Sequence, residues 1–233
     1  MIPYFELGKL FTIPFINKDV QSFGVLVAIG IIIAYNLGQW KAKQNGLDQE
    51  KFSSLVTFML ITGFIFAHIF DHLFYHFDEL VKNPFSILYF WSGLSSFGGF
   101  FGSYMGILYY CKKHKLNMYA YADVICFALP VGYIFGRAGC AVVHDHIGAR
   151  TNFFLGINFP DTVHGQYIAN LAGTRHDLGF YEMLLAIFIS SIFLILRNKK
   201  NVPNGYYVSL LCLIYAPVRF YFDSLRATDL SGA

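Results

Sequence analysis

The residues best suited to chemistry lie in the stretch 136–148, GRAGCAVVHDHIG. Arg137 directly follows an apolar run, and the histidines His144 and His146 flank Asp145 a little further on. In an extended segment these two imidazoles would point the same way, and a carboxylate can orient an imidazole for general-base catalysis. The stretch could therefore hold an anion and move a proton, with a purely structural loop cluster as the alternative for the triplet.

A second arginine, Arg219, has a similar setting near the end of the last apolar run. A guanidinium at membrane depth is costly unless it has a partner, and its planar, permanently charged fork suits phosphate bidentately. The alternatives are snorkelling for both arginines and, for Arg219, an ion pair with Asp223 one helical turn away. We expect Arg137 and Arg219 to hold a phosphate group together.

A polar stripe lies in an otherwise apolar segment and contains His68, Asp71, His72, Tyr75 and His76. At 100° per residue these positions share one face of a helix. The stripe could be a proton relay, or half of a metal site, because two histidines four residues apart can ligate one ion. The alternative is the hydrated outer end of a membrane helix.

The elements that must position these residues are membrane spans. Hydrophobic residues make up 56% of the 233-residue chain and charged residues only 13%, against about 25% charged in soluble proteins. The apolar runs long enough to approach or reach membrane-spanning length are 22–40, 52–76, 97–111, 118–136, 178–196 and 205–225. This predicts an all-α integral membrane protein of about six transmembrane helices, forming one membrane domain over residues 1–233.

The mixed stretch 137–176 separates the fourth and fifth runs and is predicted to be an extracytoplasmic insert. Lysine and arginine support this orientation, because cytoplasmic links retain basic residues. The links after the first, third and fifth runs hold nine basic residues, whereas the link after the second holds Lys82 alone. Both termini are therefore predicted to lie outside.

Glycines recur every four residues in the third run, at Gly98, Gly102 and Gly106. This spacing permits close contact between two helices. The four cysteines have no CxxC or CxxH spacing, so we expect neither a disulfide framework nor a structural zinc site. We also expect no cofactor.

The stretch GRAGCAVVHDHIG resembles the signature of the bacterial prolipoprotein diacylglyceryl transferases, Gly-Arg-x-Gly-Asn followed by an acidic residue and a glycine. The corresponding residues here are Arg137, Gly139, Cys140, Asp145 and Gly148. Three further stretches are similar in the same order, SSFGGFFG at 95–102, TRHDLGFYEMLL at 174–185 and YAPVRFYFDSLR at 215–226. The resemblance covers most of the chain.

The resemblance implies a transferase of the bacterial cytoplasmic (inner) membrane that acts at its outer face. Members move the diacylglyceryl group of phosphatidylglycerol to the lipobox cysteine thiol of a prolipoprotein and release glycerol phosphate. The implied partners are an anionic phospholipid such as phosphatidylglycerol, an acceptor protein or lipid, and the membrane, with no nucleic acid. By resemblance, Arg137 and Arg219 would hold and stabilise the lipid phosphate, with Asp145 in support. Together with His144 and His146, the candidate bases of the triplet, these are the predicted catalytic residues. The implied substrate-binding residues are Gly98, Gly99, Gly139, Cys140, Gly148, Arg175, His176, Tyr181, Glu182, Tyr215 and Asp223.

Four positions depart from the family pattern. Phe97 stands where the family has a histidine, Phe23 where it has a tyrosine, Cys140 where it has the signature asparagine, and His68 where it has an arginine. A different histidine would then serve as the base. Two other functions remain open at this point, a metal-dependent membrane hydrolase using the histidines at 68, 72, 144 and 146, and a non-catalytic lipid-binding relative.

Overall fold

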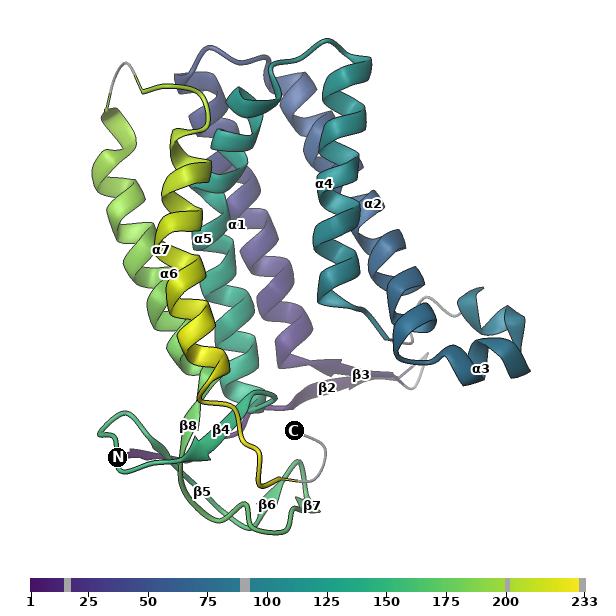
Figure 1. The fold of residues 1–233 in the computed structure, drawn as a ribbon, viewed down its shortest axis with the longest axis vertical. Helices are drawn as coiled ribbons and strands as arrows, with labels where there is room; N and C mark the ends of the chain where they lie inside the picture. The colour runs from purple at the N-terminus through teal and green to yellow at the C-terminus, as the bar shows by residue number, and fades with distance from the viewer. Residues whose placement is uncertain (15–17, 89–92, 200–201, 231–233) are drawn as a thin grey trace. The chain divides into compact units, whose positions relative to one another are not determined.

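A computed structural model describes residues 1–14, 18–88, 93–199 and 202–230, and helices predominate (Figure 1). The chain forms two compact units. We call Met1–Gly38 with Ile125–Ala233 the terminal unit, and Gln39–Val124 the central unit.

Each of the six predicted apolar runs contains a helix. The long helices are α1 (Ser22–Gln44), α2 (Gln49–Phe74), α4 (Ser96–Lys113), α5 (Met118–Val143), α6 (Leu178–Ile195) and α7 (Tyr206–Asp223). The shorter ones are α3 (Phe77–Lys82), η1 (Pro84–Leu88) and η2 (Leu196–Asn198). Within the residues that the structure describes, four helices are long and apolar enough to cross a membrane. They are α1, α2, α5 and the helix formed by α6 with η2. The counterparts of the third and sixth predicted spans, α4 and α7, have 18 residues each.

Helix α5 continues beyond the predicted end of the fourth span. Its last turns include Arg137 and Cys140, which the sequence analysis had placed at the start of the insert. Small and apolar residues in 138–143 are compatible with a helix, and the chain leaves it at His144, whose φ of 52° is left-handed. Arg137 is therefore held on a helix.

Short strands add to the expected all-α architecture. One sheet has the order β1 (Ile2–Pro3), β5 (Ile157–Phe159), β8 (Gly173–Asp177), β4 (Ile147–Arg150), with β1 parallel to β5 and the other pairs antiparallel. Two hairpins are β2 (Lys9–Ile13) with β3 (Lys18–Gln21), and β6 (Thr162–Val163) with β7 (Gln166–Tyr167). A small apolar core supports the sheet and includes Ile157, Phe159, Val163 and Leu171. The segment 147–177 is thus a packed β structure rather than a loop.

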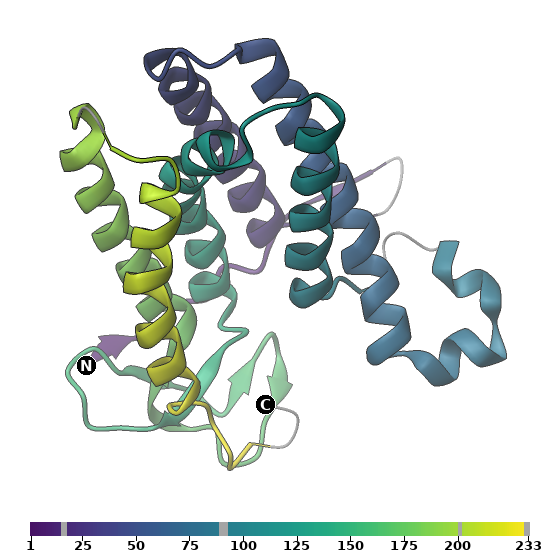
Figure 2. The ribbon, with the colours of Figure 1, turned by 45° about the horizontal axis from the view of Figure 1, so that its top comes forward.

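Aromatic packing joins the helices of the terminal unit. Phe127 of α5 lies edge-on to Tyr207 of α7, with ring centroids 5.1 Å apart, and Phe193 of α6 lies 5.2 Å from the same tyrosine. All three side chains are buried. Figure 2 shows α6 and α7 side by side. This packing sets α5, α6 and α7 together and so brings their polar residues to one place.

Glycines allow α2 and α4 to pack closely in the central unit. Gly98, Gly102 and Gly106 are all buried. An added Cβ at Gly98 or Gly102 would lie 2.5 Å from atoms of α2, including the side chain of Phe66 in the case of Gly102. The predicted close helix contact is confirmed.

This packing predicts that Gly102→Ala destabilises the protein. The new methyl group would meet a backbone carbonyl and the Phe66 side chain, and overpacking of this kind costs about 1–3 kcal/mol. The matched control is Gly24→Ala on α1, where a Cβ has nothing within 4 Å. Thermal unfolding in detergent measures both variants. Equal midpoints for the two would contradict this account of the packing.

Candidate active site

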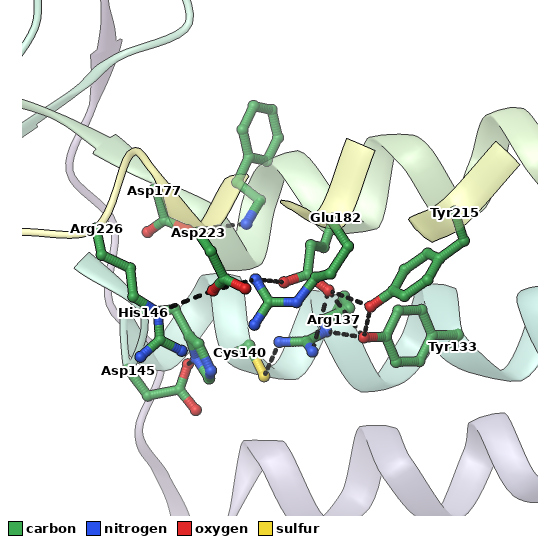
Figure 3. Close-up of polar contacts among 12 residues, drawn as sticks. Tyr133, Arg137, Cys140, Asp145, His146, Asp177, Glu182, Tyr215, Asp223 and Arg226 are labelled. Carbon is green, nitrogen blue, oxygen red and sulfur yellow. Dashed lines mark hydrogen bonds and ion pairs between the residues drawn. The ribbon is translucent and has the colours of Figure 1, made fainter. Parts of the chain in front are cut away.

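A buried carboxylate lies at the centre of the polar cluster in the terminal unit (Figure 3). Glu182 of α6 is fully buried. Its Oε2 accepts hydrogen bonds from the hydroxyls of Tyr133 and Tyr215, at 2.8 and 3.1 Å, and lies 3.0 Å from Nη2 of Arg137. Its Oε1 lies 3.4 Å from Nη1 of Arg219. One carboxylate thus ties together two arginines that are far apart in the sequence.

The positions of the two arginines follow from helical spacing. Tyr133 and Arg137 are one turn apart on α5, and Tyr215 and Arg219 are one turn apart on α7, so each tyrosine shares a face with its arginine. Nε of Arg137 donates to the Tyr133 hydroxyl at 2.7 Å, and the two tyrosine hydroxyls lie 3.0 Å apart. The repeated Tyr-x-x-x-Arg spacing builds both sides of the site.

Positive charge exceeds negative charge among the residues linked to Glu182. Asp223 pairs with Arg219 at 3.1 Å and with Arg226 at 3.3 Å. Three guanidiniums, those of Arg137, Arg219 and Arg226, therefore share two carboxylates. Nη1 of Arg219 is buried and, within the described part of the chain, has ion-pair partners but no hydrogen-bond partner. A buried donor of this kind is suited to an incoming anion.

A second group of polar side chains lies beside Arg137 at the end of α5. Nη1 of Arg137 is 3.9 Å from Sγ of Cys140. Nδ1 of His146 lies 2.5 Å from Oδ1 of Asp145, and Figure 3 shows both residues on the Cys140 side of the cluster. Cys140 is buried, His146 is half-buried and Asp145 is exposed. The structure therefore brings together three of the residues that the sequence analysis singled out.

His144 does not belong to this group, contrary to the expectation that it could serve as a base. Its Nδ1 lies 2.6 Å from the Asp177 carboxylate, and its Nε2 lies 2.9 Å from the carbonyl oxygen of Phe5. Its ring stacks on Tyr4 at 4.7 Å and is buried. A carbonyl only accepts, so Nε2 donates to it and Nδ1 shares a proton with Asp177. The backbone at His144 is left-handed, so the extended geometry expected for the triplet is wrong, and the two imidazoles contact different aspartates.

Arg175 is fully buried inside the insert. Its guanidinium donates to the backbone carbonyls of Gly148, Asn170 and Leu171 and binds both carboxylate oxygens of Asp229. These contacts occupy all five of its N–H groups, so we assign Arg175 to holding the insert together rather than to touching a substrate.

His176 and Tyr181 lie at the polar corner of an apolar pocket of about 620 Å³ between the insert, α6 and α7. Nδ1 of His176 lies 2.9 Å from the Tyr181 hydroxyl. Burial lowers the pKa of His176, which favours the neutral imidazole at neutral pH. Their expected role in substrate binding stays a prediction.

The predicted glycines mark close approaches. A Cβ at Gly148 would lie 2.7 Å from atoms of His176 and Leu225, and one at Gly139 would lie 2.9 Å from the Phe23 ring. Gly98 and Gly99 belong to the central unit, and their expected contact with a substrate stays a prediction.

The histidine stripe also belongs to the central unit. His68, Asp71 and His72 are buried, so the stripe is more than the hydrated end of a helix. Nε2 of His68 lies 2.9 Å from the carbonyl oxygen of Ile87, and His76 lies 3.0 Å from Asp71. These contacts give the stripe a structural role in holding the chain that follows α2.

Sequence reasoning missed Tyr133, Asp177 and Arg226. The signal for Tyr133 was present, because the Tyr-x-x-x-Arg spacing occurs at both arginines. Asp177 caps α6 by accepting from the backbone N–H of Phe180 at 2.8 Å, and nothing in the spacing indicates that it also holds His144.

The pairing of His144 with Asp177 predicts that His144→Ala loosens the N-terminal segment. Removing one partner of a buried pair costs about 3–5 kcal/mol, and the Phe5 carbonyl also loses its donor. Limited proteolysis should then cut residues 1–8 faster, with a lower unfolding midpoint. The exposed His114 is the control, and His114→Ala should change stability by about 0.5 kcal/mol or less. Unchanged proteolysis in His144→Ala would rule out the anchoring role.

Comparison with known proteins identifies the family. Residues 9–233 match the family described as prolipoprotein diacylglyceryl transferase. Similar proteins include the phosphatidylglycerol–prolipoprotein diacylglyceryl transferases of Ehrlichia canis (27% identical, covering 91% of this chain and 80% of the relative) and Acinetobacter baumannii strain ACICU (28%, 91% and 77%). That of Staphylococcus saprophyticus is 27% identical over 97% of this chain and 78% of its own length. The chain belongs to the prolipoprotein diacylglyceryl transferase family.

Proposed function

We propose that this protein transfers the diacylglyceryl group of phosphatidylglycerol to the cysteine thiol of a prolipoprotein, and that Arg137 and Arg219 hold the lipid phosphate. The observation that carries the proposal is the buried Glu182 between the two guanidiniums. This one carboxylate aligns both arginines, and the pair of guanidiniums keeps a net positive charge for the phosphate. The names of the relatives support this substrate pair and do not favour a metal-dependent hydrolase or a non-catalytic relative.

In this reaction the bond between the diacylglyceryl carbon and the phosphate oxygen breaks, and its electron pair leaves with glycerol phosphate. The acceptor sulfur forms the new bond to that carbon, and the thiol proton passes to water. Negative charge on the leaving phosphate grows as the bond breaks, so contacts from Arg137 and Arg219 strengthen in the transition state and accelerate the step. Tyr133, Tyr215 and Glu182 fix the guanidiniums beforehand, which avoids reorganisation during the reaction.

Activation of the acceptor falls to Cys140, Asp145 and His146. They lie beside Arg137, whereas both ring nitrogens of His144 are occupied. Asp223 completes the site by orienting Arg219. The closely packed glycines Gly139 and Gly148 let the start of α1 and the insert approach the site.

In the membrane, we propose six transmembrane helices, with α4 and α7 as the third and sixth, in the inner membrane of a bacterium. The insert and both termini lie on the outer side, so that the chain forms one membrane domain. The support is the concentration of basic residues around the α1–α2, α4–α5 and α6–α7 connections, including the last turns of α1 and α4. The phosphate site is then at the level of the outer leaflet headgroups.

This proposal predicts that Arg137→Lys and Arg219→Lys each lower kcat by about 10²–10³-fold, since an ammonium keeps the charge but loses the planar fork. The alanine variants should abolish transfer while the protein still inserts. Release of glycerol phosphate from labelled phosphatidylglycerol measures the rate. Arg150→Lys on the exposed face of the insert is the control and should retain activity. Release of glycerol phosphate by both Arg137→Ala and Arg219→Ala at the wild-type rate would contradict the proposal.

A second prediction concerns the shared carboxylate. Glu182→Gln leaves two largely buried guanidiniums with one anion fewer, which should cost about 3–5 kcal/mol of stability. Phosphatidylglycerol should then raise the unfolding midpoint of this variant more than that of the wild type, because the lipid phosphate replaces the missing charge. Phosphatidylcholine serves as the comparison lipid. An equal shift in both proteins would show that the phosphate does not bind between the arginines.

A further inference from the structure

Three different metal-ligating side chains converge beside the phosphate site. Cys140 comes from the last turn of α5, and Asp145 and His146 come from the segment leading into β4. Their donor atoms, one from each residue, all lie within 4.8 Å of one another. Within the described ranges of the chain, this is the one group of three His, Cys, Asp or Glu residues close enough to share an ion.

The donor set matches a particular ion. One sulfur, one imidazole nitrogen and one carboxylate oxygen suit zinc, which binds them at about 2.3, 2.0–2.1 and 2.0–2.2 Å. Cys140 is anchored on a helix, while Asp145 and His146 reach solvent and have room to adjust onto an ion. A thiolate and a carboxylate also neutralise the two charges of Zn²⁺. Three protein ligands leave a fourth position open, as in catalytic zinc sites.

We propose that Cys140, Asp145 and His146 bind a zinc ion whose open position takes the thiol of the acceptor. This inference rests on the proposed transferase function and specifies how its acceptor is activated. It also departs from the sequence expectation that no cofactor is needed. A thiol that coordinates zinc is deprotonated and remains a nucleophile, so the ion does the work of a general base.

The step balances without a further reactant. The acceptor thiol gives its proton to water on binding zinc, and the resulting thiolate sulfur attacks the diacylglyceryl carbon. The carbon–oxygen bond to phosphate breaks, and glycerol phosphate leaves with the electron pair. The thioether product is neutral and binds zinc more weakly than a thiolate, which allows release. The second thiolate brings an extra negative charge to the ion, which Arg137, 3.9 Å from the Cys140 sulfur, offsets.

Access to the ion is available from the N-terminal side. A pocket of about 620 Å³ is bounded by Asp145, Val143 and Phe23 together with Glu6 and His164, whose Oε1 and Nδ1 lie 2.6 Å apart. The pocket reaches Asp145, one of the three proposed ligands. An acceptor entering here would approach the ion from a direction separate from the buried Glu182.

Cobalt substitution tests the site directly. The purified full chain in detergent is stripped with a chelator and titrated with Co²⁺, and we expect one ion per chain with thiolate-to-cobalt charge-transfer bands. His146→Ala and Cys140→Asn should each weaken Co²⁺ binding by roughly 100-fold or more. The His146→Ala variant should still fold, because His146 is only half-buried. Loss of outer-shell groups alone costs about 10–100-fold. Cys212→Ala, at the exposed cysteine of α7, is the matched control and should bind as the wild type does.

Two further measurements separate this inference from the proposed function. N-acetylcysteine amide should change the cobalt spectrum by occupying the open position, and transfer activity should fall on chelation and return with zinc. Absence of stoichiometric metal, or equal metal binding by His146→Ala and the wild type, would overturn the zinc site. If transfer proceeds without metal but needs His146, the imidazole is a simple base and the zinc proposal fails alone. If metal binds but no glycerol phosphate is released, the transferase function fails and the ion has no thiol substrate to activate.

Discussion

The structure of the site depends on a single buried carboxylate. Burying the charged side chains of Glu182 and two arginines away from water carries a large desolvation cost. Their attraction offsets this cost only with good geometry and further hydrogen bonds. Two tyrosine hydroxyls supply those hydrogen bonds at Oε2. Oε1 and Nη1 of Arg219 form an ion pair without a hydrogen bond. The cluster is therefore well satisfied on the Arg137 side and incomplete on the Arg219 side, where a lipid phosphate would complete it.

The surrounding elements hold this cluster in place. Aromatic packing between α5, α6 and α7 sets the helices, and Asp177 caps α6 five residues before Glu182. Asp177 also binds His144, which in turn holds the N-terminal segment through the Phe5 carbonyl. The sheet then joins β1 at the N-terminus to the insert. The N-terminal segment is thus tied to the same helix that carries the shared carboxylate.

Hydropathy and local spacing predicted what depends on one segment at a time. The six helical segments and the tight glycine packing of α4 are of this kind. The functional importance of Arg137 and Arg219 stays a prediction. The missed features depend on contacts between distant segments. The β1–β5 pairing joins residues more than 150 positions apart, and the roles of Tyr133, Glu182 and His144 follow from partners on other elements. A histidine in a polar triplet has no local signature that separates a base from an anchor.

The proposed reaction depends on Arg137 and Arg219 holding a lipid phosphate between them. The most direct test is an experimental structure of the protein in a lipid bilayer containing phosphatidylglycerol. We expect a phosphate within hydrogen-bond distance of both guanidiniums, with Glu182 still bridging them. A bound phosphatidylglycerol whose phosphate contacts neither arginine would contradict it.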